Sequence, residues 1–211
     1  MEDIMFRYQA ADYVQDPNTL LRSLAAKLDQ FETANPDAKT GAWTLAVQSA
    51  LQDMGEKAGK GIEHFCTRTA KQTGTGEFLL DAVWWRRVTP NEVEHIALAV
   101  ESEFAAWVKN REEVATEVVK DFEKLLVIKS PLKLMIFCSW YGKGDTDLTP
   151  MRSAIWSRLK KCVAQYSHHI EGEKYLFLDT AVMGERKGWI FTVPRSGSVS
   201  LDEIKEEYIS L

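Results

Sequence analysis

One apolar run between two helical patterns constrains the fold of this sequence most. Residues 132–140 are mostly hydrophobic, which is typical of a strand buried on both faces near the centre of a sheet. An amphipathic helix is expected before the run, over residues 111–128, and another after it, over residues 150–166, with Thr149 as its N-cap. Because helices on either side of a buried strand can cover both faces of a sheet, the sequence predicts a mixed α/β fold.

The rest of the chain divides into helical and strand patterns in the same way. Helical spacing predicts helices over residues 20–31 and 43–54, the second resuming at 62–65. Strands are expected at 77–85, 95–104, 175–182 and 189–193, with a turn at 86–91 and a short acidic helix at 201–208. The predicted organisation is an N-terminal helical segment, residues 1–70, packed on an α/β core, residues 71–211.

Charge and composition exclude several classes of protein. The chain has 26 Lys and Arg against 31 Asp and Glu, a net charge of −5, which argues against a histone-like coat on nucleic acid but allows a local basic groove. No apolar run has the length of a membrane span and the start lacks an export signal, so we expect a cytoplasmic protein without membrane contact. Cys66, Cys138 and Cys162 are expected to be reduced, buried thiols.

Three carboxylates on two neighbouring predicted strands form the main candidate site. Asp81 lies within an apolar stretch, where burial without a partner is costly. Glu101 and Glu103 are two residues apart, so a strand points both to one face. Acids gathered in this way repel one another unless a cation lies between them, and Mg²⁺, with Mn²⁺ as an alternative, prefers such oxygen ligands. An exposed edge strand carrying Glu to block aggregation remains the alternative.

A cationic group near these acids would stabilise charge on a scissile phosphate. Lys124 lies one turn after Asp121, beside the apolar stripe of the helix over 111–128, and can lean towards Glu101. Lys120, one turn earlier on the same helix, is the second candidate for this cationic group. Both can equally be solvated lysines whose aliphatic stems cover the core.

The acids and the lysine together resemble the PD-(D/E)XK nuclease superfamily, in particular uncharacterised bacterial members. The similar segments are residues 77–81, 99–104 and 121–126, which lie within about residues 76–141. The resemblance implies a restriction-endonuclease-like fold, a mixed central sheet flanked by helices. The sequence departs from the superfamily motif in two ways: no Pro precedes Asp81, and Glu103 occupies the position that is usually Lys. A short strand near residues 63–68 would complete the three strands that the superfamily places before its helix.

The resemblance also implies roles for the candidate residues. Asp81 and Glu101 would hold Mg²⁺, with the Ser102 carbonyl as a further ligand. Glu103 would orient or deprotonate water, and Lys124 would stabilise the developing negative charge. The expected activity is hydrolysis of phosphodiester bonds in nucleic acid, with DNA as the expected substrate and a homodimer if both strands of a duplex are cut. The alternatives are a catalytically inactive binding or assembly module on the same fold, and an unrelated α/β domain.

Basic residues and a histidine pair complete the candidate residues. Contacts to phosphates would come from a modest set of cations: Arg86, Arg87, Lys143, Arg152, Arg158, Lys160 and Lys161. Adjacent residues do not share a helix or strand face, so His168 and His169 are interpreted as an exposed helix end rather than a metal pair.

Overall fold

The computed structural model describes most of the chain in seven stretches. These are residues 16–58, 62–66, 80–89, 92–104, 111–139, 147–181 and 186–211, the side chains at 87–89, 92–94 and 111 excepted. In these stretches helices and strands form an α/β protein with two N-terminal helices and a seven-stranded mixed sheet.

The strands lie in the sheet in the same order as in the sequence. They are β1 Ile62–Cys66, β2 Ala82–Thr89, β3 Glu92–Glu103, β4 Leu132–Phe137, β5 Lys174–Asp179, β6 Lys187–Thr192 and β7 Lys205–Ser210. Only the β3–β4 and β4–β5 pairs are parallel. Parallel neighbours need crossovers, which contain α5 (Arg111–Val127) and α6 (Thr149–Gln165). The C-terminal ends of the three parallel strands β3, β4 and β5 therefore lie side by side at the same end of the sheet.

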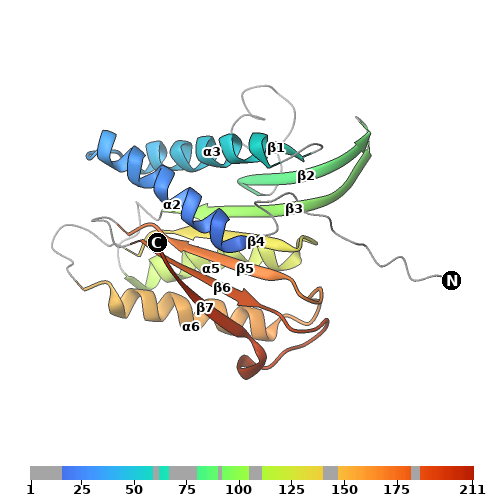
Figure 1. Ribbon diagram of the computed structural model, residues 1–211. Helices are drawn as coiled ribbons and strands as arrows, with labels where there is room; N and C mark the ends of the chain where they lie inside the picture. Colours follow the sequence, from blue (N-terminus) through green and yellow to red (C-terminus); the bar gives the residue numbers. More distant parts are fainter. Residues whose placement is uncertain are drawn as a thin grey trace.

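Helices cover both faces of the sheet (Figure 1). On one face, α2 (Pro17–Ala34) and α3 (Thr40–Lys57) share a hydrophobic core with alternate residues of the strands, and α5 and α6 share a second core on the other face. All six residues of β4 are buried between them. The predicted central apolar strand and the α/β class are thus confirmed.

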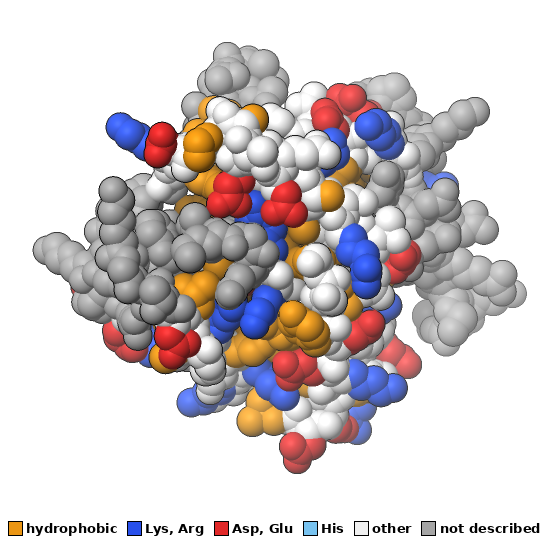
Figure 2. All heavy atoms as spheres, turned by 60° about the vertical axis from the view of Figure 1, so that its left-hand side comes forward, with side chains coloured by type: hydrophobic (Ala, Val, Ile, Leu, Met, Phe, Trp, Pro, Cys, Tyr) orange, Lys and Arg blue, Asp and Glu red, His pale blue; other side chains and the backbone are white. Residues whose placement is uncertain are grey.

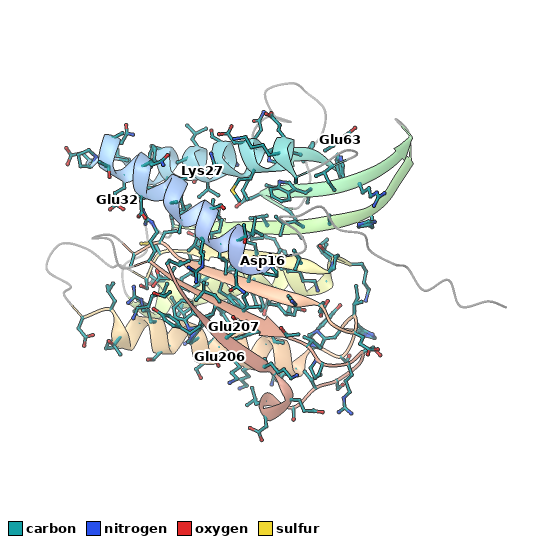
Figure 3. All side chains as sticks on the ribbon, in the orientation of Figure 1. Asp16, Lys27, Glu32, Glu63, Glu206 and Glu207 are labelled. Carbon is teal, nitrogen blue, oxygen red and sulfur yellow. The ribbon has the colours of Figure 1, made fainter. Side chains whose placement is uncertain are left out.

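A close contact between α3 and β2 fixes the first core. Trp84 is fully buried, and its indole Nε1 donates to the Leu51 carbonyl oxygen at 3.2 Å. A Cβ on Gly55 would lie 2.9 Å from the same indole nitrogen, so this position has no room for a larger side chain. Lys27 on α2 lies beside α3 (Figure 3) and pairs with Asp53 at 3.1 Å, joining the two helices.

Four local predictions are corrected. Residues 62–65 form strand β1 rather than resuming a helix, because they pair with β2. The expected turn at Arg86 is wrong, since β2 continues to Thr89. The N-cap of α6 is Leu148, and Thr149 is already helical. The expected acidic helix is only the 3₁₀ turn Leu201–Glu203, followed by β7, because pairing with β6 outweighs the helix propensity of its glutamates.

The predicted division of the chain at residue 70 stays a prediction. The structure adds that β1, which precedes this boundary, is the first strand of the sheet, so the helical segment ends before it. Cys66, Cys138 and Cys162 are free thiols, as expected, but the expected burial is correct only for Cys66, since Cys138 and Cys162 are partly exposed. No helix in the described part of the chain is long and apolar enough to cross a membrane.

Candidate functional site

Asp81 is held at the end of β3 by Ser102. Asp81 lies in a bend directly before β2, not in mid-strand as predicted, and the pairing of Ala82 with Val100 brings it beside the end of β3. Its Oδ2 accepts hydrogen bonds from the Ser102 backbone N at 2.8 Å and the Ser102 Oγ at 2.7 Å. Two donors on one oxygen fix the carboxylate and leave Oδ1 without a hydrogen bond to a described residue.

Glu101 is a buried acid between β3 and α5. Alternation along β3 places it on the α5 side with Ala99, and only 1% of its surface is exposed. Its Oε2 lies 3.2 Å from Lys124 Nζ, while Oε1 is buried and has no hydrogen-bond partner among the described residues. A buried carboxylate oxygen without a partner is rare and costly, which makes this atom a candidate ligand position.

Lys124 reaches this acid from the flank of α5, as the helical spacing predicted. Its Nζ also pairs with Asp121 Oδ1 at 2.7 Å, so one lysine lies between two acids. The second choice, Lys120, is wrong for this site: its ammonium pairs with Glu117 and is more exposed.

The electrostatics favour a protonated Glu101 in the absence of a cation. Burial, followed by the negative charge of Asp81, raises the pKa of Glu101 to about 8, although Lys124 opposes the shift. Burial lowers the pKa of Lys124, but its contacts with Asp121 and Glu101 outweigh burial and raise that pKa above its usual value. When Glu101 gives up this proton, three carboxylates, Asp81, Glu101 and Asp121, share the one ammonium of Lys124, and a divalent cation would balance the excess negative charge.

Glu103 lies at the end of β3, half-buried and opposite Phe137 in the register. By alternation it belongs to the same strand face as Glu101. Its assigned role in handling water stays a prediction. The edge-strand alternative for these glutamates is wrong, because β3 pairs with β2 on one side and β4 on the other.

The residues present offer an incomplete set of metal ligands. Within the described stretches, no group of three or more His, Cys, Asp or Glu side chains is arranged to hold a metal ion. Among the described residues, Asp81 Oδ1 and Glu101 Oε1 have no hydrogen-bond partner, which fits an ion such as Mg²⁺ that takes one or two carboxylates and otherwise water or substrate oxygens. The Ser102 carbonyl as a further ligand stays a prediction.

Three of the seven predicted phosphate-binding cations pair with acids. Arg152 is buried and its Nε lies 2.5 Å from Asp179 Oδ2, Arg158 pairs with Glu112, and Lys160 lies 3.1 Å from Glu206. Arg86 is half-buried in β2 and Lys161 is exposed on α6, while Lys143 and the Arg87 side chain lie outside the described residues. Figure 2 brings forward the side at which α2 ends and α6 begins, and its basic and acidic side chains are interspersed. The described side chains of this face thus give no continuous basic band.

Asp179 and His169 are among the buried polar groups that the sequence patterns did not predict. Asp179, at the end of β5, accepts hydrogen bonds from Ser139 N at 2.9 Å and Ser139 Oγ at 2.6 Å, a clamp like that of Asp81 and Ser102. His169 is buried, so the exposed helix end holds only for His168. Asp179 could have been predicted, because it is an acid at the end of an apolar strand. The two adjacent histidines show no pattern that indicates burial.

Comparison with known proteins finds no matching family model, no matching curated protein and no matching solved structure.

Proposed function

We propose that this protein is a metal-dependent nuclease that hydrolyses phosphodiester bonds, with DNA as the expected substrate. The observation that carries the proposal is the buried Glu101 carboxylate, which has one oxygen without a partner and the other paired with Lys124. Asp81, fixed by Ser102 beside it, supplies a second carboxylate. Two acids and a lysine at the ends of neighbouring strands suit phosphoryl chemistry, in which negative charge must be balanced.

The order of the elements supports a restriction-endonuclease-like fold for the same region. The resemblance implies three strands between two helices, followed by a further strand. The chain follows this order from α3 through β1, β2 and β3 to α5 and β4, with β1 as the expected short strand. Of the three similar segments, residues 99–104 cover the end of β3 and residues 121–126 lie within α5. Asp81 of the first segment directly precedes β2, and residues 77–79 lie outside the described residues.

Each residue has a definite task in this mechanism. Asp81 and Glu101 would hold Mg²⁺ through their free oxygens, and the ion would supply Lewis-acid polarisation of the phosphoryl group and a more acidic water. Glu103, the last residue of β3, would accept the proton of the attacking water. Lys124, kept charged by Asp121, would stabilise the negative charge that builds on the phosphoryl oxygens.

One observation favours the alternative, a catalytically inactive module on the same fold. Among the described residues no three-ligand metal group is preformed, and Lys124 already offsets part of the charge on Glu101. In that case the ion pair would only stabilise the fold, and the protein would bind nucleic acid or a partner without cutting.

Calorimetric titration with Mg²⁺ and with Mn²⁺ tests the metal site. Wild type should bind one ion, and Glu101→Gln and Asp81→Asn should each abolish binding. Glu207→Gln is the matched control, since Glu207 is exposed on β7, the strand at one edge of the sheet (Figure 3). Wild type that binds no ion, or binding that survives both site variants, overturns the site.

Cleavage assays then separate the enzyme from the inactive module. Purified protein is incubated with plasmid, single-stranded DNA and RNA in Mg²⁺ or Mn²⁺. The nuclease proposal requires cleavage by wild type and by Glu207→Gln but not by Glu101→Gln. Metal binding without cleavage of any of the three substrates supports the module instead.

A further inference from the structure

A buried arginine and a buried acid form an ion pair at the same end of the sheet as the candidate site. Asp179 is the last residue of β5, and Arg152 lies in the first turn of α6. Asp179 is fully buried, whereas one tenth of the Arg152 side chain is exposed. This end of the sheet lies on the side of the molecule that Figure 2 brings forward, where α6 begins.

The register of the parallel strands places this ion pair relative to the candidate site. Glu103 on β3 lies opposite Phe137 on β4, and Phe137 lies opposite Asp179 on β5. Residues directly opposite each other share one face of a sheet, so Asp179 belongs to the α5 and α6 side, as Glu101 does. Because neighbouring strands lie about 5 Å apart, the backbones of Glu103 and Asp179 are roughly 10 Å apart.

Asp179 uses both of its oxygens to accept hydrogen bonds within the protein. Oδ1 accepts from the backbone N of Ser139 at 2.9 Å and of Ala181 at 3.1 Å. Oδ2 accepts from the Ser139 hydroxyl at 2.6 Å and from Arg152 Nε at 2.5 Å. A carboxylate has about four acceptor positions, and protein donors use that number here. Asp179 is therefore suited to hold the Arg152 guanidinium in one orientation, and not to bind a metal ion.

We propose that Arg152, oriented by Asp179, binds a substrate phosphate that flanks the scissile one, so that the substrate is a chain of nucleotides and not an isolated phosphodiester. This inference rests on the proposed nuclease function. Asp179 holds Nε, and the Nη1 and Nη2 groups of the planar guanidinium would donate to the phosphate oxygens, a geometry that suits phosphate. Asp179 is a positioning residue in this arrangement.

The spacing of the two sites and their charges determine this substrate class. A single phosphate bound at Asp81 and Glu101 is too small to reach Arg152 as well, because the sites are two strands apart. A nucleic-acid strand carries a negative charge on every nucleotide, so a second phosphate of the same strand can reach the arginine. The first turn of α6 contains no acidic residue, and the helix dipole adds positive potential at this position.

Kinetics on two substrates test the proposal. Bis(p-nitrophenyl) phosphate is a diester with a single phosphate, whereas a short single-stranded oligonucleotide has several. Arg152→Met/Asp179→Asn removes both charges of the ion pair and conserves the net charge of the protein. The double variant should lower kcat/KM for the oligonucleotide at least about tenfold more than kcat/KM for the single diester, through a rise in KM, because one charge-assisted contact is lost.

A second ion pair provides the matched control. Arg195→Met/Glu203→Gln also conserves the net charge, but this pair follows β6 and lies at the opposite end of the sheet. It should leave the ratio of the two kcat/KM values at the wild-type value. A wild-type ratio in Arg152→Met/Asp179→Asn overturns the Arg152 assignment and leaves the nuclease proposal standing.

A single substitution tests the positioning role of Asp179. Asp179→Asn keeps the arginine but removes the charge that orients it, so it should shift the same ratio in the same direction, to a smaller extent. A wild-type ratio in Asp179→Asn would show that Asp179 does not position the arginine for substrate.

Binding measurements test Arg152 separately from cleavage. Wild type that cleaves neither substrate would overturn the nuclease function, and the affinity for the oligonucleotide is then measured against salt concentration. In a plot of log affinity against log salt, the slope for Arg152→Met/Asp179→Asn should be less steep than that of wild type by about 0.7, the value for one phosphate contact on a single strand. Equal slopes, or no binding by wild type, overturn the Arg152 site.

Discussion

Lys124 on α5 and Glu101 on β3 form an ion pair of 3.2 Å in which the acid is 1% exposed and the lysine side chain 42% exposed. The pair is therefore asymmetric: Glu101 is desolvated, whereas Lys124 is partly hydrated and also paired with Asp121. Coulombic attraction from one partly solvated lysine does not offset the burial of the carboxylate. The acid of such a pair is available to a stronger cation.

The first prediction concerns stability against pH. Because the folded pKa of Glu101 is raised to about 8 from 4.5, the folded state holds the extra proton between these values, and the unfolding free energy falls as pH rises through that window. Glu101→Gln should therefore stabilise the metal-free protein by about 1–3 kcal/mol near pH 8.5 and change it little near pH 4.5. Urea unfolding at both pH values is the measurement, and an equal effect at both would contradict the assignment.

The same proton should make metal binding dependent on pH. An ion that binds Glu101 must displace its proton, so the affinity for Mg²⁺ should rise with pH by up to about tenfold per unit below pH 8 and level off above it. Calorimetry in two buffers of different ionisation enthalpy reports the released proton. A pH-independent affinity between pH 6 and 8 would show that Glu101 is not a ligand.

The hydrogen bonds from Ser102 to Asp81 are expected to hold the Asp81 carboxylate in place for metal binding, and a matched serine variant separates this effect from a loss of stability. Ser102→Ala removes one of two donors to Asp81, which should cost about 1 kcal/mol of stability and about tenfold in metal affinity. Ser139→Ala removes the corresponding hydroxyl from the Asp179 clamp and should lower stability without changing metal affinity. Equal effects of the two variants on Mg²⁺ binding would mean that Ser102 does not position a ligand.

How far the sequence predicts this protein depends on where the determining contacts lie. The apolar run of β4 and the helical stripe of α5 are local patterns, and both formed as expected, as did the approach of Lys124 to Glu101. β7 was misjudged because its residues, apart from Ile209, are exposed and polar, and only pairing with β6 makes it a strand. The burial of His169 could not be predicted from local patterns either. Lys133 is distant from it in the sequence, and Glu173 belongs to no recognisable pattern.

A lysine comparison tests the assigned role of Lys124. Lys124→Met should lower the cleavage rate by about a hundredfold, because it removes charge stabilisation, while Mg²⁺ affinity is kept or improved since Glu101 Oε2 is freed. Lys120→Met, which removes an exposed lysine of the same helix, should leave both unchanged. Normal cleavage by Lys124→Met would show that Lys124 has a structural role and takes no part in cleavage.

The last prediction concerns Arg186, which joins the N-terminal helices to the sheet. Its guanidinium is 2% exposed and pairs with Asp29 at 2.8 Å and Glu32 at 2.7 Å, both on α2. It also donates to the Thr180 carbonyl oxygen at 3.3 Å and lies 5.4 Å from the Trp43 ring centre on α3. Truncating a buried cation that carries these ion pairs leaves its acidic partners uncompensated.

Arg186→Ala should therefore lower the unfolding free energy by about 3–5 kcal/mol, measured by urea unfolding. Arg195→Ala is the matched control, because Arg195 pairs with Glu203 at 2.9 Å while its side chain is 61% exposed, and such a pair contributes at most about 1 kcal/mol. In the background Asp29→Asn/Glu32→Gln the same truncation should cost less, because the two ion pairs are already absent. A loss below about 1 kcal/mol for Arg186→Ala would show that α2 is held by its apolar face alone.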